Sequence, residues 1–368
     1  MKKISFFVAC VAIAMAGMLS SCSSSDTPAA PQVVSDVVVD EANYTLKVTS
    51  NVDARFTYGN AVKQLKANKQ ESITFTSKEF SYEVSATGYA KIDGTVKFSD
   101  KQKVTAITLE LVKESTNKVA QSAAKGNTVT NDAANQKATE ASAAIQVPSD
   151  VNVSGNTTDA FSVTACTPAP TVSAGEDIKA NQTEEGGVLS LSCTPDGATF
   201  SKPVTLKATI PGASGLALSV PGASNVKQSG NEISFDVNHF SVWDIVLQAT
   251  VQSITEGSMQ VASLSMLVNN GENTFTFNKN IGVEGSSSNA LVQAFIASNF
   301  GNTSSKQATT GKFMADGSGS ATIVVNQSYR DISFKSGTVT FTVRVWGECS
   351  STITTSSDTS KHSGGTGR

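Results

Sequence analysis

The feature that most restricts the fold of this chain is the alternation of apolar and polar residues in many short runs. In residues 338–346, for example, Val339, Phe341 and Val343 alternate with threonines. Successive side chains of a β-strand point to opposite faces of a sheet, so such a run buries one face and leaves the other polar. Comparable runs, separated by Gly, Pro, Asn and Asp, recur from residue 44 onwards. The pattern predicts an all-β protein of tandem antiparallel β-sandwich domains.

One short helix is expected in the C-terminal part of the chain, at residues 289–300. Leu291 and Phe295 lie four residues apart, as do Val292 and Ile296, so both pairs share one side of a helix. A glycine follows the segment, which is typical of a helix end.

The first 21 residues are predicted to be a secretory signal peptide. Lys2 and Lys3 precede an apolar run at residues 4–19. This run is too short for a membrane-spanning helix, and a basic start followed by a short apolar stretch is typical of an export signal. The chain is therefore expected to leave the cytosol.

Residues 19–22, Leu-Ser-Ser-Cys, resemble the lipobox of bacterial lipoproteins, of a Bacteroidota-like type. In that family the cysteine thiol is acylated and the chain is cleaved immediately before it. The resemblance implies that Cys22 is the lipidated amino terminus and that residues 23–32 are a polar tether to the folded body. An ordinary signal peptide followed by a chance cysteine is the alternative.

Two regions resemble small β-sandwich families. Residues 33–113 include YTLKVTS and a Gly88-Tyr89 step before a new strand, and they resemble the PEGA-like sandwich of bacterial envelope proteins. Residues 147–248, with the sequence HFSVW, resemble ZU5-like sandwiches of bacterial surface proteins. Both resemblances imply a fold and an architectural role, and neither implies a reaction. Residues 249–349 are expected to form a third, β-rich domain, which contains the helix.

Two segments lack the apolar residues needed for a core. Residues 114–146 are rich in Ala, Asn, Lys and Gln, and we expect a linker or a weak helix there. A surface helix packed only through its alanines is the alternative. Residues 350–368 are polar and are expected to be a disordered tail.

Three cysteines remain after the signal peptide and Cys22 are set aside. Cys166 and Cys193 each begin a Cys-Thr-Pro triplet after a strand-like run, and a disulfide between them is one hypothesis in an oxidising compartment. Two separate buried thiols are the other hypothesis. Cys349 is expected to be unpaired. No Cys-x-x-Cys spacing occurs, so no metal site is predicted.

The histidine content disfavours familiar hydrolytic machinery. The chain has two histidines, His239 and His362, and the second lies in the tail. No Gly-x-Ser-x-Gly, His-Glu-x-x-His or phosphate-binding glycine loop occurs. We therefore predict no enzymatic activity and no cofactor. A carboxylate-based glycoside hydrolase is a lower-ranked alternative, with acid and base candidates Glu184, Glu185, Asp236, Asp244 and Asp331.

Charge and aromatic content bear on the partners. Removing Lys2 and Lys3 with the signal peptide leaves 26 basic and 31 acidic residues, a net charge of −5. No cluster of Lys or Arg is present, so nucleic acid is not an expected partner. Trp346 and Tyr329 are the candidate aromatic contacts for a glycan ligand. For Trp346, an aromatic plug at a domain junction is the alternative.

Together these features predict a lipid-anchored protein of the cell envelope, held in the outer membrane by its acyl chains on the surface or periplasmic face. We expect a non-catalytic protein that binds glycan or protein partners through loops of a β-sandwich array. A structural subunit of a surface assembly or of a membrane-active complex is the alternative.

Overall fold

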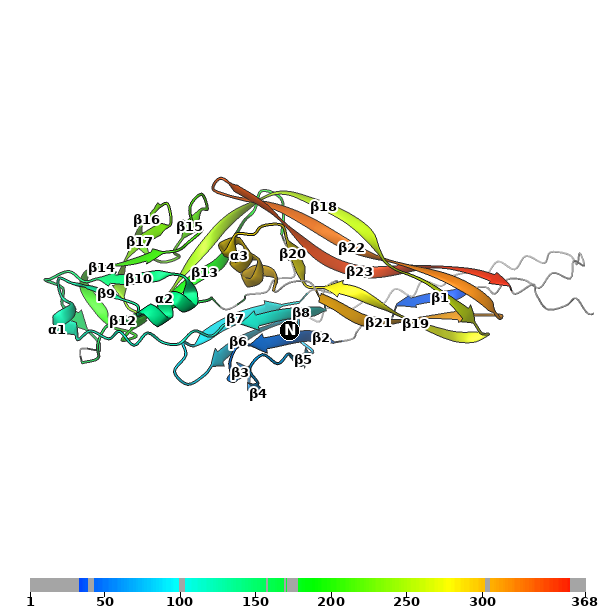
Figure 1. Ribbon diagram of the computed structural model, residues 1–368, viewed down its shortest axis with the longest axis horizontal. Helices are drawn as coiled ribbons and strands as arrows, with labels where there is room; N and C mark the ends of the chain where they lie inside the picture. Colours follow the sequence, from blue (N-terminus) through cyan, green and yellow to red (C-terminus); the bar gives the residue numbers. More distant parts are fainter. Residues whose placement is uncertain are drawn as a thin grey trace, which may run out of the picture.

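The computed structural model describes residues 33–38, 43–98, 103–156, 158–168, 170, 178–301 and 305–357, and it shows an elongated molecule built almost entirely of strands (Figure 1). Within these residues there are 23 strands and three short helices, so the predicted all-β class is confirmed. The predicted signal peptide, Cys22 and the tether lie outside the described residues. Among the helices of the described part, none has both the length and the apolarity needed to span a bilayer.

Residues 43–98 and 103–113 form a small N-terminal sandwich. Its strands are β2 (Tyr44–Ser50), β3 (Ala54–Tyr58), β4 (Ala61–Leu65), β5 (Glu71–Phe75), β6 (Glu79–Ser85), β7 (Ile92–Lys97) and β8 (Val104–Leu109). One sheet has the order β5-β2-β8 and the other the order β4-β3-β6-β7. The alternating apolar side chains meet between the two sheets, where Leu46, Val48 and Phe56 are fully buried. The period-two pattern of the sequence therefore accounts for this core.

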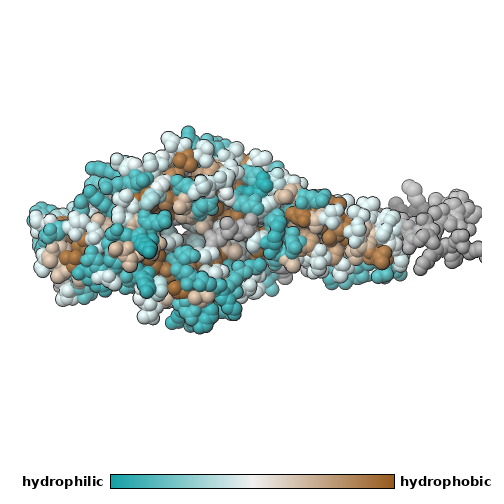
Figure 2. Space-filling view, viewed as in Figure 1, coloured by the Kyte–Doolittle hydropathy of each residue, from teal (hydrophilic) through white to brown (hydrophobic). Residues whose placement is uncertain are grey.

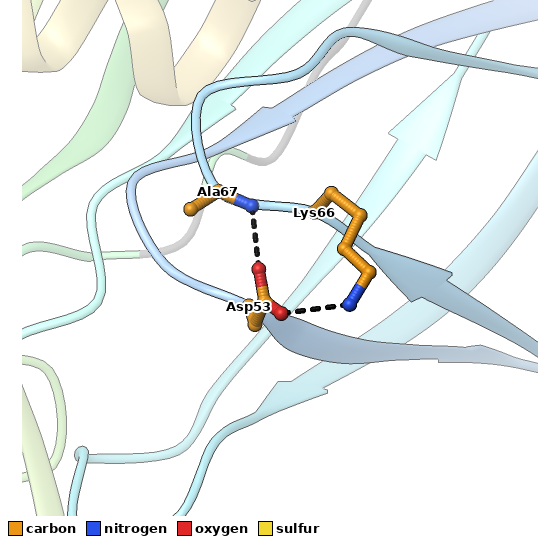
Figure 3. Close-up of polar contacts among 3 residues, drawn as sticks. All are labelled: Asp53, Lys66 and Ala67. Carbon is orange, nitrogen blue, oxygen red and sulfur yellow. Dashed lines mark hydrogen bonds and ion pairs between the residues drawn. The ribbon is translucent and has the colours of Figure 1, made fainter.

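Asp53, just before β3, fixes a loop of the N-terminal sandwich. Its Oδ1 accepts a hydrogen bond from the backbone N–H of Ala67 at 2.8 Å, and its Oδ2 accepts one from Lys66 Nζ at 2.8 Å (Figure 3). The Lys66 contact and the Ala67 N–H both stabilise the ionised carboxylate, so the pKa of Asp53 is lowered from its usual value. Because the ion pair is exposed, its role is to hold the β4–β5 connection rather than to add much stability.

Strand β1 (Val33–Val38) lies outside the N-terminal sandwich, contrary to the expected domain boundary at residue 33. β1 pairs antiparallel with β21 (Ser305–Ala315), with Val33 opposite Ala315 and Val38 opposite Gly311. The N-terminal sandwich is therefore an insertion between β1 and the rest of the chain. An alternating pattern shows which face of a strand is buried but does not identify the partner strand, which is why the sequence misplaced this boundary.

A central sandwich of two larger sheets follows. The strands of its first sheet are β9 (Thr128–Thr130), β10 (Ser142–Gln146), β11 (Val153–Ser154), β14 (Thr199–Thr209), β16 (Ser224–Ser229) and β17 (Glu232–His239), in the order β16-β17-β14-β10-β9 with β11 also on β14. The strands of its second sheet are β12 (Ser162–Cys166), β13 (Thr183–Thr194), β15 (Leu218–Ser219), β18 (Val242–Val268), β20 (Val283–Gly285), β22 (Gly319–Ser336) and β23 (Val339–Ser357). Their order is β12-β13-β18-β22-β23-β20, with β15 also on β18. Phe161, Phe235 and Phe240 are among the buried side chains between the sheets.

Helix α3 (Ala290–Phe300) confirms the helix predicted at residues 289–300. Asn289 caps its start by accepting a hydrogen bond from the backbone N–H of Leu291 at 2.8 Å. The helix packs against β13 at Gly186, where a Cβ would lie 2.6 Å from the Phe295 ring. Phe295 in turn contacts Phe334 edge-to-face, with ring centroids 5.6 Å apart. The glycine thus allows the helix to approach the sheet closely enough to cover the central core.

Residues 114–146, expected to be a linker or a weak helix, are part of the central sandwich. Besides β9 and β10 they include α1 (Gln121–Ala124) and α2 (Ala133–Thr139). β10 pairs with β14, with Ile145 opposite Leu206, and both Ala143 and Ile145 are buried. The expectation was wrong because alanines give a weak hydrophobic pattern, although they fill a sheet interior where neighbouring elements approach closely.

Asn135 of α2 ties this segment to the neighbouring sheet. The side chain is 2% exposed, and its amide accepts a hydrogen bond from the Ala165 N–H at 2.9 Å and donates one to the Ala165 carbonyl at 3.0 Å. The Asn135 amide therefore binds the backbone of β12 through the same pair of hydrogen bonds that a neighbouring strand would form. It also accepts a hydrogen bond from Asn131 Nδ2 at 2.8 Å and donates one to the Lys113 carbonyl at 3.3 Å. The amide joins α2, β12 and the exit from the N-terminal sandwich.

The expected boundary between a second and a third domain, between residues 248 and 249, is absent, because β18 runs through it. β18, β22 and β23 are 27, 18 and 19 residues long and stay paired along almost their whole length. We call these three paired strands the ribbon. The halves of the ribbon that lie away from the central core form a distal sandwich with a second sheet. That sheet has the order β1-β21-β19, in which β19 is Gly271–Ile281. β23 continues to Ser357, so the expectation of disorder is wrong for residues 350–357, and residues 358–368 lie outside the described part.

The buried face of this three-stranded ribbon changes sides along its length. In β22, Ile332 and Phe334 face the central core, whereas Ile323 and Val325 face the distal core. The first two have even residue numbers and the last two have odd ones, so the two pairs point to opposite faces of the sheet. Register shifts in the ribbon, at Gln260/Ala262 and at Gln327/Tyr329, accompany the change. The central and distal sandwiches are thus built on opposite faces of one continuous sheet.

We predict that Asn135→Ala lowers the free energy of unfolding by about 2–3 kcal/mol, since a buried polar group that loses its partner costs roughly 1–3 kcal/mol. Chemical denaturation measures the effect. Lys137→Ala, an exposed position on the same helix, is the matched control and should change stability by less than about 0.5 kcal/mol. Equal, small effects of both substitutions would show that residues 114–146 are a linker after all.

Candidate functional site

The two cysteines considered for a disulfide have separate thiols, so that hypothesis is wrong. In the β12–β13 pair, Val163 lies opposite Cys193 and Cys166 lies opposite Ser190. Cys166 and Cys193 therefore point to opposite faces of the sheet, and both are free and buried. Burial raises the pKa of Cys166 to about 12 and also raises that of Cys193. The alternative of two separate buried thiols is the arrangement found, and Cys349 is also free.

We predict that Cys166, Cys193 and Cys349 are all alkylated when the mature protein is unfolded in iodoacetamide without a reductant. The reason is that the sheet register keeps the first two thiols on opposite faces. Peptide mass spectrometry reads the modification, and a prereduced sample is the control, which should give the same three modified peptides. A Cys166–Cys193 cross-linked peptide in the unreduced sample would contradict the register.

Trp346 is buried, so the hypothesis that it contacts a ligand is wrong for the folded protein. Its side chain is 4% exposed, and it lies where the ribbon changes its buried face. Tyr329 lies opposite Trp346, with ring centroids 5.9 Å apart, and the Arg344 guanidinium stacks 3.9 Å from the centre of the Tyr329 ring. Asp331 holds Arg344 through two hydrogen bonds of 2.7 Å. Trp346 is therefore an aromatic plug at a domain junction, and Tyr329, which is half-buried, packs with it.

A polar cleft of about 640 Å³ lies between the N-terminal sandwich and the central body, and we call it the interdomain cleft. Its lining comes from β6 and β7 of the N-terminal sandwich, from β12 and the residues just after it, from β13 and β18, and from the end of α3. Polar side chains that line this cleft include Asp93, Glu185, Ser190, Asp244, Ser298 and Asn299. Clefts between domains are common positions for ligand sites, which makes this one the candidate site.

Tyr82 fixes the two walls of the interdomain cleft relative to each other. This residue of β6 is buried, and its hydroxyl donates a hydrogen bond to the carbonyl of Pro170 at 2.7 Å. Gly94 on β7 lies beside the same carbonyl, where a Cβ would be 2.7 Å from the oxygen. Burial raises the pKa of Tyr82, so its proton remains available for this bond. The N-terminal sandwich is therefore held against the central body by a specific contact.

The floor of the interdomain cleft carries paired polar groups. Ser190 Oγ donates a hydrogen bond to Asp244 Oδ1 at 2.5 Å across the β13–β18 pair. Gln248 Nε2 donates one to Glu185 Oε1 at 2.8 Å. Each carboxylate has a second oxygen, and such hydroxyl, amide and carboxylate groups suit a ligand that has several hydroxyls. This side of the interdomain cleft is therefore lined by polar side chains.

The carboxylates considered for a glycoside hydrolase do not all meet in this cleft. Glu185 and Asp244 line it, whereas Asp236 accepts a hydrogen bond from Thr205 Oγ1 at 2.6 Å within the first sheet and Asp331 binds Arg344. Burial raises the pKa of Glu184, and this residue is not among those lining the cleft. His239 ends β17 with its ring centroid 5.1 Å from that of Trp243.

A second cleft of about 660 Å³ lies at the junction of the N-terminal sandwich with α2. Asp132, the cap of α2, accepts hydrogen bonds there from the N–H groups of Thr116 at 2.6 Å and Asn135 at 2.7 Å. These bonds lower the pKa of Asp132 to about 2. Because its carboxylate is already occupied, Asp132 is a structural residue of the junction.

No group of three metal-ligating side chains occurs among the described residues.

Sequence reasoning missed the interdomain cleft. Its residues come from five separate stretches of the chain, and none of them forms a motif. Serine, aspartate and asparagine are ordinary on strand surfaces, so only the docking of the N-terminal sandwich gives these residues a common site. The Tyr82–Pro170 contact that makes the cleft is equally invisible in the sequence.

Comparisons with known proteins add little. No family model matches the chain, and no curated protein matches it. Among solved structures, one is described as a membrane-associated protein of unknown function from Bacteroides fragilis NCTC 9343. It shares 11% sequence identity, the alignment covers 86% of this chain and 99% of that one, and the TM-score is 0.21. A TM-score this low carries no argument about fold or function.

Proposed function

We propose that this protein is an exported lipoprotein, anchored in the outer membrane through Cys22, that binds a hydroxyl-rich ligand such as a glycan without catalysis. The position of β1 carries this proposal. Val33 of β1 lies opposite Ala315 of β21. β1 lies towards one end of the elongated molecule, whereas β7, β13 and α3, which contribute residues to the interdomain cleft, lie nearer its middle (Figure 1). An anchor at Cys22 would therefore leave the cleft away from the lipid and open to the surroundings.

The length of the tether is consistent with this arrangement. Ten residues separate Cys22 from Val33. Fully extended, they reach about 35 Å at most, so the end of the molecule that carries Val33 would stay near the bilayer. The long ribbon of β18, β22 and β23 then leads away from that end towards the central sandwich. The tether and the ribbon together would hold the cleft at a distance from the lipid headgroups.

We predict that Cys22→Ser moves the protein from the membrane fraction to the soluble fraction and abolishes its labelling by palmitate, because the acylated thiol is the anchor. Cell fractionation and metabolic labelling measure the two effects. Cys349→Ser, which also replaces one cysteine by serine, is the matched control and should leave both unchanged, because the Cys349 thiol is free. Full membrane retention of the Cys22→Ser protein would refute the anchor.

We also predict that Asp244→Asn weakens binding to the glycans that the unaltered protein retains on an array of oligosaccharides and polysaccharides. The expected loss is at least about tenfold, since a charged hydrogen bond to a ligand contributes roughly 1.5–3 kcal/mol. Asp236→Asn is the matched control, because Asp236 accepts a similar hydrogen bond from Thr205 outside the cleft. Equal affinities of the two variants, or no glycan bound by the unaltered protein, would count against the cleft as a glycan site.

A further inference from the structure

The end of the molecule that carries Val33 also carries exposed hydrophobic side chains. This end, which we call the tip, consists of the turn between β18 and β19 and the turn between β21 and β22 (Figure 1). Leu267 precedes the first turn and is 79% exposed, and Met314 precedes the second and is 40% exposed. Leu267 has the largest exposed fraction of any large hydrophobic side chain in the described residues. Figure 2 shows hydrophobic surface near this end of the molecule.

The exposure of Leu267 does not come from a frayed strand end. Its neighbour Val268 is buried in the distal core, and Leu267 itself pairs with Ser320 of β22. The turn that follows is closed by Asn273, whose Oδ1 accepts a hydrogen bond from the Asn269 N–H at 3.0 Å and whose Nδ2 donates one to the Asn269 carbonyl at 2.8 Å. The fold therefore displays this leucine on a paired strand that ends in a hydrogen-bonded turn.

Met314 lies on the other sheet of the distal sandwich. Its neighbours Phe313 and Ala315 point into the distal core, so Met314 faces outward. It pairs with Glu272 of β19, and Glu272 in turn forms an ion pair with Lys312 at 3.3 Å. Leu267 and Met314 thus lie on the two outer faces of the tip, with polar turns between them. A planar surface that met the tip end-on would approach both side chains.

The geometry points to a bilayer surface as the partner of the tip, and this inference rests on the lipid anchoring proposed above. The first residue of β1, Val33, lies opposite Ala315. Ala315 is the last residue of β21, the strand that leads into the second turn. The ten residues that precede Val33 end at Cys22, so the acyl chains would hold the tip within about 35 Å of the lipid. We propose that the tip rests on the membrane, with Leu267 and Met314 among the lipid headgroups.

Two side chains suffice for such a contact only because the anchor is on the same molecule. A free protein with two exposed hydrophobic residues would bind lipid weakly, since stable membrane binding requires larger apolar area or a second signal. The tether keeps the tip close to the bilayer, so the effective concentration of lipid near the tip is high. A contact that is weak on its own is then formed most of the time. The contact would orient the ribbon away from the membrane rather than provide the anchorage.

An environment-sensitive fluorophore tests this contact in the full-length, lipidated protein. NBD is attached through Leu267→Cys in a Cys349→Ser background, and the protein is reconstituted into phosphatidylcholine/phosphatidylethanolamine vesicles, with and without nitroxide-labelled lipid. We expect the NBD emission to shift to shorter wavelength and to be quenched by the nitroxide lipid. NBD at Val226→Cys is the matched control, because Val226 is a 38% exposed valine on β16 in the central sandwich, and it should show neither effect.

Vesicle flotation separates failure of this inference from failure of the anchor. If the protein floats with the vesicles and NBD at position 267 behaves like NBD at position 226, the tip does not touch the bilayer and the inference is wrong. If the protein does not float, the anchoring proposal itself fails. If the emission shifts without nitroxide quenching and depends on the protein-to-lipid ratio, Leu267 contacts a second copy of the chain instead, which also overturns the inference.

Discussion

Continuous hydrogen bonding along β18, β22 and β23 is the constraint on which the rest of the structure depends. The β18–β22 pair extends from Thr250 opposite Lys335 to Val268 opposite Gly319, and β23 accompanies β22 from Ser336 to Gly319. Both larger cores are built on this ribbon, on opposite faces of it. Along these three strands, the same ladders of backbone hydrogen bonds run through both the central and the distal sandwich. Bending the molecule at this point would require breaking them, so the two sandwiches form one stiff unit.

The N-terminal sandwich is a separate core that is attached to both the distal and the central sandwich. It is inserted between β1, which belongs to the distal sandwich, and the segment around Ser115, whose N–H donates a hydrogen bond to Thr164 Oγ1 of β12 at 2.9 Å. The Tyr82–Pro170 hydrogen bond adds a third attachment. An inserted domain with attachments at both chain ends and at one side is limited in its motion. The interdomain cleft is therefore a preformed site, and a ligand would not have to pay a large ordering entropy to create it.

Local patterns in the sequence were sufficient to predict the strand-rich class and the helix at Ala290–Phe300, because period-two and period-four spacings follow directly from strand and helix geometry. Features that depend on long-range pairing were not predictable in this way. β1 has a strand-like sequence that does not specify β21 as its partner, and β18 contains no turn signal at the expected boundary because no turn exists there. The alanine-rich β10 was likewise misjudged, since its burial depends on neighbours distant in sequence. For Trp346 the sequence left a ligand contact and an aromatic plug open, and the burial of its side chain favours the plug.

The stiffness of the ribbon and the position of β1 together determine what an anchor at Cys22 would do. A tether attached to a flexible chain of domains would leave the orientation of the cleft undefined. Here the strand that follows the tether is hydrogen-bonded to β21, and β21 pairs with β19 and contributes Phe313 and Ala315 to the same core as β18 and β22. Any restraint on the tip is therefore transmitted through packed strands to the central sandwich. The direction in which the cleft faces would be set by the contact between the tip and the lipid, and the acyl chains alone would set only its distance from the membrane.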